Sequence, residues 1–217
     1  MSKSVENTNE IHATWYFDDL IRLGYLIKYV RESETFICRP KLTYSFHEVL
    51  PTKLKEREGS LFSEITYTPD YKLFWTEKAR YIFFEEEFTT IRPRFKYGRP
   101  LFLAYKEDDN LVTRIDVKPT SNVSKKGGKV SSSATFGLKQ RMIYDAYGIY
   151  IHKFIPVPMA GTGIKVAIFP NSFTPSRYLW TDGRTQLRTI HFPIITVEEF
   201  VNKKIKEMEN FDKIRGK

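Results

Sequence analysis

Apolar and polar residues in the first third of the chain are spaced in two ways, and each spacing predicts a different element. Apolar residues at roughly helical spacing over 9–23 predict a helix that Asn9 caps and that ends at Gly24. Runs of aromatic and β-branched residues predict strands over 25–30, 35–38 and 41–49. An alternating pattern over 62–75 predicts a further strand or hairpin arm. The charged run 53–58 predicts a solvated turn.

Strand and helix patterns continue in the middle of the chain. The acid-rich segment 107–110 predicts a hairpin turn, and the apolar segment 111–117 predicts the strand that follows it. Lysine, serine and glycine dominate 121–133, which predicts a mobile loop. Apolar positions then predict a helix over 136–147 and a strand over 149–157.

The last third is rich in loops and ends with one clear helix signal. Thr196 and Glu199 have the spacing of a capping box, so a helix is predicted to begin there and to end near Asn210. The segment 166–169 predicts a short strand. The chain has no internal repeat and no linker that suggests a second domain. A length of 217 residues is enough for one sizeable core.

Composition adds a strong positive charge to this picture. The chain has 35 Lys and Arg residues against 26 Asp and Glu residues, a formal net charge of +9 at pH 7. A polyanionic partner fits such a chain, because clustered cations release counterions when they meet phosphates. The alternative is a basic surface that only aids solubility.

Residue types also exclude several kinds of site. Cys38 is the single cysteine, so the chain has no internal disulfide and no multi-cysteine zinc site. The four histidines are scattered, which argues against a histidine-based metal site. No apolar run approaches the roughly 20 residues that span a bilayer, and the polar segment 1–9 has no signal region. These features predict a cytoplasmic protein with no membrane partner.

An acid and a lysine two residues apart stand at the end of the strand 111–117. Residues two apart in a strand face the same side, so Asp116 and Lys118 are predicted to project together. A carboxylate supplies the oxygen ligands that a hard divalent cation prefers, and Asp70 would add a second one from a neighbouring strand. Metal-activated water beside a cation is a physical route to phosphodiester hydrolysis. The alternative is a solvent-facing strand edge, because acid-x-Lys triplets are common.

The order of these motifs resembles the PD-(D/E)xK nuclease superfamily, which has the restriction-endonuclease-like fold. The resemblance rests on Pro69-Asp70, on Asp116-Val117-Lys118 and on two flanking features, and it covers about 9–155. One feature is Gln140 with Tyr144, similar to a Gln-x-x-x-Tyr element in the helix after the lysine strand. The other is Glu10, which matches a metal-binding acid in the first helix of branches similar to phage endonucleases and to the transposon-end endonuclease subunit.

The resemblance implies both a fold and an activity. The implied fold is α/β, a restriction-endonuclease-like core with a central mixed β-sheet flanked by helices. In this chain the long gap between the two aspartates predicts an inserted hairpin region over 76–110, and the extension 159–217, with its C-terminal helix, lies outside the resemblance. The implied activity is that of a Mg²⁺-dependent DNA endonuclease of phage or mobile-element type, in which Mn²⁺ substitutes. Asp70, Asp116 and Glu10 would bind the metal, and Lys118 would position the attacking water and stabilise the transition state.

Two features depart from the family's pattern. Asp70 and Asp116 are farther apart in sequence than the usual hairpin, so Glu85, Glu86 or Glu87 is an alternative ligand to Asp70. Pro119 directly after the lysine is predicted to end the strand early, because proline cannot donate to the ladder. The alternative for Glu10 is a first-turn glutamate that the helix dipole favours.

A second group of residues is predicted to hold the DNA. Its members are cations in a loop, an amide on a helix and cations in an aromatic stretch: Lys125, Lys126, Lys129, Gln140, Arg94 and Lys96. Solvated loop lysines, side-chain packing and a basic hairpin are the respective alternatives. The rival function is a non-catalytic nucleic-acid-binding or structural protein with a nuclease-like fold. Whether the protein acts as a homodimer stays open.

Overall fold

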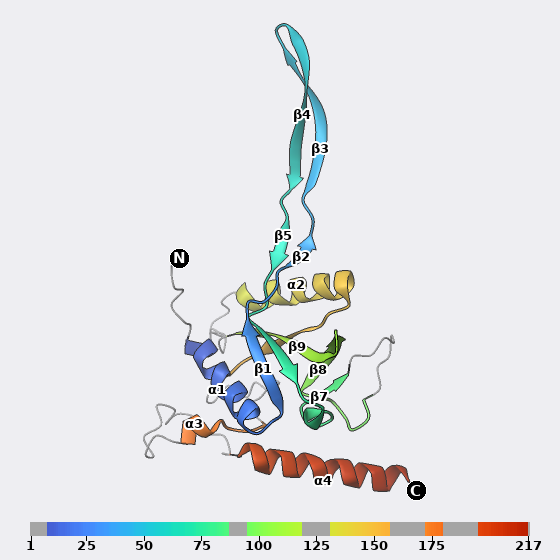
Figure 1. Cartoon of the computed structure of the whole chain (residues 1–217). Coiled ribbons are helices and arrows are strands. Elements are labelled where there is room, and N and C mark those ends of the chain that lie inside the picture. The colour runs from blue at the N-terminus through green and yellow to red at the C-terminus, as the bar shows by residue number, and fades with distance from the viewer. Residues whose placement is uncertain (1–7, 87–94, 119–130, 157–171, 180–194, 217) are drawn as a thin grey trace, which may run out of the picture.

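A computed structural model shows an α/β fold in which helices flank a mixed β-sheet (Figure 1). It describes residues 8–86, 95–118, 131–156, 172–179 and 195–216. The α/β class and the mixed central sheet predicted from the sequence are therefore confirmed. Within the described residues, no helix is long and apolar enough to cross a membrane.

The central strand of the sheet is β9 (Asn110–Val117), which has neighbours on both edges. The order across the sheet is β1 (Leu26–Arg31), β6 (Tyr71–Trp75), β9, β8 (Phe102–Glu107) and β7 (Phe84–Glu86). Antiparallel pairing joins β1 to β6, β6 to β9 and β8 to β9, and parallel pairing joins β7 to β8. The last strand in the described part of the chain, β10 (Ile151–Phe154), pairs with the final four residues of β9 in parallel. The region 76–110 thus supplies β7 and β8 to the sheet, after a 3-10 turn at Glu77–Ala79.

One face of the sheet is covered by the first and last helices, α1 (Thr8–Arg22) and α4 (Val197–Arg215). The alternate residues Tyr71, Leu73 and Trp75 of β6 point into this core. The α1 residues in the same core are Ala13, Tyr16, Phe17 and Leu20, and those of α4 are Val197, Phe200 and Val201. Gly24 follows α1 with φ +74°, the left-handed conformation that glycine tolerates best.

The C-terminal segment joins this core through specific polar contacts. Glu199 N donates to Thr196 Oγ1 at 3.1 Å, and Thr196 N donates to Glu199 Oε2 at 2.9 Å, which confirms the predicted capping box. The helix runs to Arg215, beyond the predicted end near Asn210. The short helix α3 (Ser176–Leu179) was not predicted, and Ser176 N donates to Asp19 Oδ2 of α1 at 2.6 Å.

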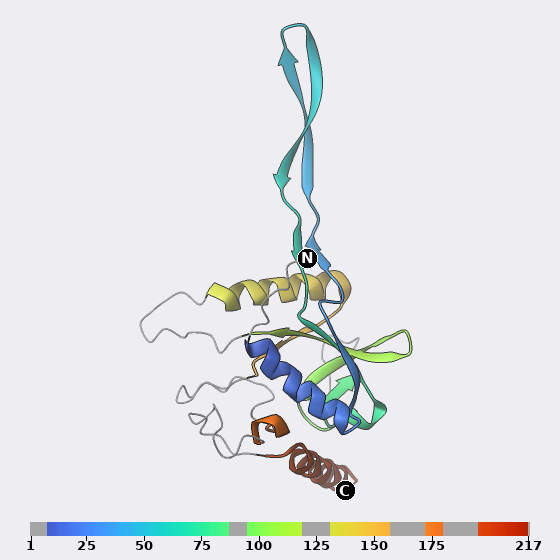
Figure 2. The same ribbon diagram turned by 60° about the vertical axis from the view of Figure 1, so that its left-hand side comes forward.

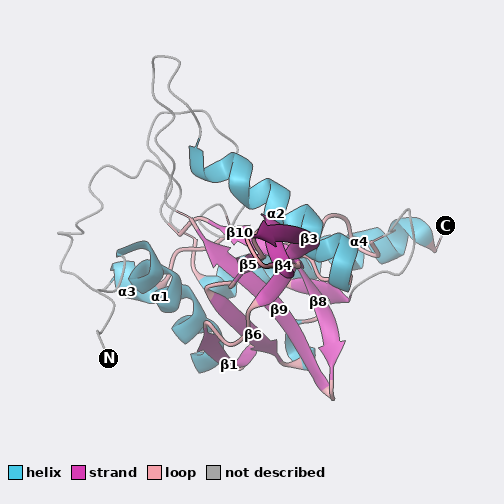
Figure 3. Cartoon of the chain, turned by 90° about the horizontal axis from the view of Figure 1, so that it is seen from above, coloured by secondary structure: helices cyan, strands magenta, loops and turns pink. Residues whose placement is uncertain are grey.

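The opposite face carries α2 (Ser131–Tyr147), which packs over β10 and over a pair of short strands, β2 (Phe36–Arg39) and β5 (Ile65–Tyr67). Figure 3 shows α2 on one side of the sheet and α1 on the other. The buried apolar residues of this second core are Phe36, Cys38, Phe136, Ile143 and Ile151. The predicted helix that ends at Gly148 is confirmed, with φ +68° at that glycine.

A long β-hairpin projects from β2 and β5 away from the rest of the molecule (Figures 1 and 2). Its strands are β3 (Leu42–Leu50) and β4 (Lys53–Phe62), paired antiparallel along their length. The prediction of a solvated turn over 53–58 was wrong, because this segment is the first part of β4. Its charged residues are exposed to solvent on a two-stranded ribbon, so a run of charges is compatible with a strand there.

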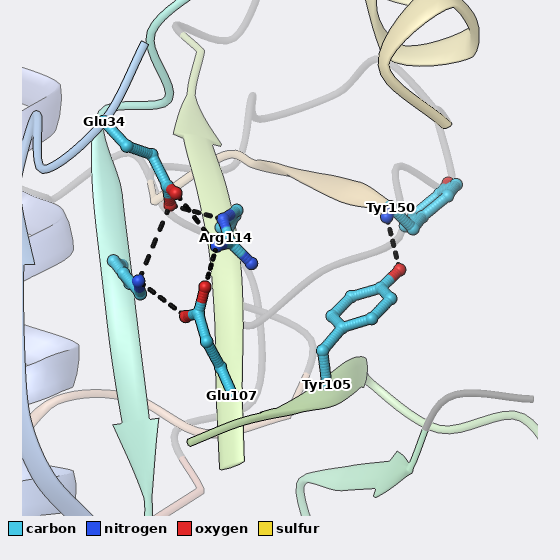
Figure 4. A network of polar contacts seen from close by, with 6 residues as sticks. Glu34, Tyr105, Glu107, Arg114 and Tyr150 are labelled. Carbon is cyan, nitrogen blue, oxygen red and sulfur yellow. Dashed lines mark hydrogen bonds and ion pairs between the residues drawn. The ribbon is translucent and has the colours of Figure 1, made fainter. Parts of the chain in front are cut away.

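A buried arginine ties the base of this hairpin to the sheet (Figure 4). The side chain of Arg114, in β9, is only 2% exposed and pairs with Glu34 and Glu107, with Nη2 to Oε distances of 3.0 and 2.8 Å. Lys72 Nζ of β6 lies 2.6 Å from Glu107 Oε2. Burial alone would lower the pKa of Arg114, but hydrogen bonds to the two carboxylates raise it. Glu34 stands just before β2, so the network joins the hairpin to three strands.

We expect Arg114→Leu to lower the free energy of unfolding by about 3 kcal/mol, because it leaves two carboxylates without their main partner. Urea denaturation measures this loss. The control is Lys204→Leu, which breaks a surface pair with Glu207 at 2.9 Å and should cost less than about 1 kcal/mol. Equal losses in the two variants would show that the Arg114 network does not stabilise the fold.

Candidate functional site

Asp70 and Asp116 lie side by side because their strands are neighbours. Asp70 directly precedes β6, and Tyr71 pairs with Ile115 of β9. The Asp70 carboxylate reaches across to β9, where its Oδ2 accepts a hydrogen bond from Val117 N at 2.6 Å. The two acids predicted to act together are thus brought together, although they are far apart in sequence.

Lys118 completes this cluster from the end of β9. Its Nζ lies 2.6 Å from Asp116 Oδ2, so the two side chains project from the same face, as predicted. The Asp116 side chain is 2% exposed and that of Lys118 is 27% exposed. The strand ends at Val117, and Lys118 N still donates to Phe154 O of β10 at 2.8 Å. The cation is therefore fixed by its backbone and directed at a buried carboxylate.

The electrostatics of the cluster favour a proton or a cation between the acids. Burial and the Asp116 carboxylate raise the pKa of Asp70 to about 7, and the hydrogen bond from Val117 N only partly offsets this. Burial and the same Asp116 carboxylate also raise the pKa of the Tyr67 hydroxyl, so Tyr67 stays neutral. Tyr67 ends β5, three residues before Asp70, and its hydroxyl lies close to the Asp116 carboxylate.

These residues fit a hard divalent cation. Two carboxylates that repel one another are stabilised when a cation neutralises both, and Mg²⁺ commonly takes one or two carboxylates plus waters and phosphate oxygens. Among the described residues, no group of three or more His, Cys, Asp and Glu side chains is placed to hold a metal. The protein ligands that the geometry offers are therefore Asp70 and Asp116.

The predicted third ligand, Glu10, lies elsewhere in this structure. Its carboxylate accepts a hydrogen bond from Arg31 Nη2 and is 22% exposed. Its backbone oxygen accepts from the Tyr71 hydroxyl at 3.4 Å, which places the start of α1 over the residue after Asp70. Glu10 is thus near the cluster in the fold, but its carboxylate is paired with Arg31.

The alternative acids at 85–87 do not reach the cluster within the described residues. Glu85 lies on β7, two strands away from β9, and its carboxylate accepts from Lys96 N at 3.1 Å and from Tyr97 N at 3.4 Å. It therefore holds the backbone of its own region. Glu86 is also on β7, and Glu87 lies outside the described residues.

The predicted DNA-binding residues are spread over several regions. Gln140 Nε2 of α2 donates to Ile151 O at 2.5 Å and so joins α2 to β10. Lys96 Nζ lies 4.7 Å from the centre of the Tyr97 ring, at the β7 edge of the sheet. Arg94 and the three loop lysines, Lys125, Lys126 and Lys129, lie outside the described residues.

Sequence reasoning missed two residues at the cluster, Tyr67 and Lys139. Lys139 of α2 donates to Thr66 O at 3.1 Å, and its Nζ lies 5.6 Å from the centre of the Tyr67 ring. The lysine precedes Gln140 directly, and the tyrosine precedes Thr68-Pro69-Asp70, so both stand beside motifs that the sequence does reveal. Only the packing of α2 on β5 brings them together.

Comparisons of the chain with protein-family models, with curated proteins and with solved structures found no match.

The raised pKa of Asp70 predicts a pH-dependent stability in metal-free buffer. Between about pH 4 and 7 the folded state keeps a proton that the unfolded state has lost, so the free energy of unfolding falls as the pH rises through this window. Asp70→Asn removes this ionisation and keeps an oxygen for Val117 N. As the pH rises from about 5 to about 8, the free energy of unfolding should fall in wild type and not in the variant. We expect the difference between the two proteins to shift by about 1–3 kcal/mol in the variant's favour, after allowance for solvent screening. Urea denaturation with EDTA at both pH values measures the free energy of unfolding of each protein. The same change with pH in wild type and variant would contradict the prediction.

Proposed function

We propose that this chain is a Mg²⁺-dependent DNA endonuclease with a PD-(D/E)xK-type site and a restriction-endonuclease-like core. The observation that carries the proposal is the convergence of Asp70, Asp116 and Lys118. A carboxylate beside β6 faces a carboxylate on β9, and a lysine two residues along β9 lies 2.6 Å from the second acid. Two acids and a lysine on adjacent strands are what the sequence resemblance implies for such a nuclease.

The order of elements around the cluster supports the same proposal. A helix with Glu10 comes first, Asp70 and Asp116 follow on neighbouring strands, and the helix with Gln140 comes after the lysine. Gln140 anchors that helix to the strand β10 that lies beside Lys118. The net charge of +9 favours a polyanionic substrate over a neutral or positively charged one.

In the proposed reaction, water attacks phosphorus and the bond from phosphorus to the leaving sugar oxygen breaks. Mg²⁺, when bound, supplies an activated water and a positive charge at the attacked phosphate. Asp70 and Asp116 would hold the ion through their carboxylate oxygens. Lys118 would orient the attacking water and stabilise the negative charge that grows on the phosphate oxygens. The proton of the water passes to solvent or to the leaving oxygen.

Asp116→Ala and Lys118→Ala test this mechanism directly. We expect the first to abolish Mg²⁺-dependent cleavage of plasmid and oligonucleotide DNA, because it removes a metal ligand. The second should reduce the rate by about 100-fold, because it removes one transition-state contact. Gel assays with Mg²⁺, with Mn²⁺ and with EDTA measure these rates.

Matched controls lie on the hairpin turn between β8 and β9 and beside it. Asp109→Ala and Lys106→Ala remove an exposed acid and an exposed lysine, and both should leave cleavage unchanged. Unchanged cutting by the Asp116 and Lys118 variants would refute the mechanism. Tight DNA binding without cleavage by wild type, on linear, branched and single-stranded DNA, would favour the rival function of a non-catalytic nucleic-acid-binding protein.

Glu10 enters the proposal as a third carboxylate that joins the metal only after its pair with Arg31 opens. We therefore expect Glu10→Gln to raise the Mg²⁺ concentration for half-maximal cleavage while the rate at saturating Mg²⁺ falls less than in Lys118→Ala. A Mg²⁺ titration of the cleavage rate separates these two effects. An unaltered titration curve would assign Glu10 to its ion pair alone.

A further inference from the structure

The projecting hairpin β3–β4, called the ribbon below, exposes large apolar side chains far from the sheet. Tyr44 is 52% exposed, Phe46 43%, Val49 80% and Leu54 67%. With nine residues in β3, the ribbon is about 30 Å long at the usual rise per residue. A two-stranded ribbon gains little stability from itself in water, so a long one with exposed aromatic residues is suited to a contact surface.

The pairing register divides the ribbon into two faces of opposite charge. One face, called the basic face, carries three cations and one acid among aromatic and apolar residues: Tyr44, Phe46, Glu48, Leu50, Lys53, Lys55, Arg57 and Gly59. The other face, called the acidic face, carries Glu56 and Glu58 with no Lys or Arg: its remaining residues are Thr43, Ser45, His47, Val49, Leu54 and Ser60. The formal charges of the two faces are therefore +2 and −2.

Side-chain contacts agree with this division. The rings of Tyr44 and Phe46 lie 5.9 Å apart, and Arg57 Nε donates to Glu48 Oε2 at 2.7 Å. A Cβ on Gly59 would lie 2.6 Å from the Tyr44 ring, so glycine is what allows this ring to lie across the neighbouring strand. The basic face thus combines flat aromatic surface with cations, the combination that suits nucleic acid.

The ribbon is firmly joined to the candidate site. Its stem strand β2 begins at Phe36 and its stem strand β5 ends at Tyr67, and these two residues pair with one another. Beside them, Thr35 and Thr68 form a hydroxyl hydrogen bond of 2.7 Å. From α2, Lys139 donates to Thr66 O, and the Tyr147 hydroxyl donates to Ile37 O at 3.2 Å. Tyr67 itself lies beside Asp70 and Asp116, so the ribbon begins at the edge of the site.

The charge pattern favours a DNA duplex over a second copy of this chain as the partner of the ribbon. In a symmetric dimer the same patch of each copy faces its equivalent, so basic face would meet basic face, or acidic would meet acidic, with like charges opposed. A DNA duplex meets the basic face with phosphates and leaves the acidic face in solvent. The major groove of B-DNA, about 12 Å wide, admits a two-stranded ribbon, and a length of about 30 Å is close to one turn of the helix.

We propose that the ribbon is an arm that holds duplex DNA through its basic face, with Lys53, Lys55 and Arg57 on phosphates and the aromatic rings against the groove. The arm's role depends on the nuclease function proposed above, because it holds that enzyme's substrate. Since its base lies at Asp70, a duplex on the arm runs into the candidate site.

The test compares two variants that lose the same charge at different places. The ribbon variant is Lys53→Ala/Lys55→Ala/Arg57→Ala, and its control is Lys203→Ala/Lys206→Ala/Lys213→Ala on exposed positions of α4, at the far end of the molecule (Figure 1). Fluorescence anisotropy with a labelled duplex of about 30 base pairs, in EDTA, measures the dissociation constant. The measurement is repeated from about 50 to about 300 mM salt, because the salt dependence of the affinity reports the number of phosphate contacts. Circular dichroism checks the fold, and Lys53→Gln/Lys55→Gln is a milder second variant.

We expect the ribbon variant to bind DNA about 10-fold or more weakly than wild type. The slope of log affinity against log salt concentration should become smaller in magnitude by about two to three, because three phosphate contacts are lost, while the α4 control changes little. DNA binding that is weakened equally in the ribbon variant and the α4 control, or that is unchanged in the ribbon variants, would refute the proposal that the ribbon is a DNA-binding arm. A ribbon variant that turns from dimer to monomer with unchanged DNA binding would assign the ribbon to a second copy instead. Duplex binding through the ribbon without Mg²⁺-dependent cleavage would refute the nuclease function and support the arm. Mg²⁺-dependent cleavage with a DNA affinity that the ribbon substitutions do not change would support the nuclease function and refute the arm.

Discussion

The burial of charge on one face of β9 is the constraint on which the rest of the structure depends. A guanidinium cannot lie in the interior without partners, so Arg114 draws Glu34 from the base of the hairpin and Glu107 from β8. Lys72 of β6 joins the same carboxylates. Figure 4 also shows the Tyr105 hydroxyl of β8 accepting a hydrogen bond from Tyr150 N, just before β10. One row of polar contacts thereby fixes the strands around β9 relative to one another.

The candidate site continues this row toward the end of β9. Arg114, Asp116 and Lys118 are two residues apart and share a face, while Ile115 and Val117 enter the core beneath α1. The buried arginine is fully matched by carboxylates, and it serves the fold. The next acid along the strand faces a second acid, Asp70, whose pKa is raised, and this unfavourable pair is the part of the row that a divalent cation would complete.

The hairpin and the site share a foundation, which links the two proposals physically. Tyr67 belongs to the stem of the hairpin and lies beside the carboxylate pair, and α2 holds both stem strands through Lys139 and Tyr147. Under the two proposals, the arm begins at the candidate site and holds a long substrate beside it. The segment between β2 and β5 would then be long, charged and exposed because it contacts that substrate.

The sequence by itself determined the local elements and the candidate chemistry. Helical spacing, capping residues and alternation located α1, α2, α4 and most strands, and strand geometry alone placed Asp116 beside Lys118. It failed at 53–58, because a charged segment that is exposed on both faces of a ribbon has no apolar alternation to reveal it. Only the tertiary structure decided which acid joins Asp116, since Asp70, Glu10 and Glu85 differ in their partners and not in residue chemistry. Strand pairing between distant segments sets those partners, and no local pattern encodes it.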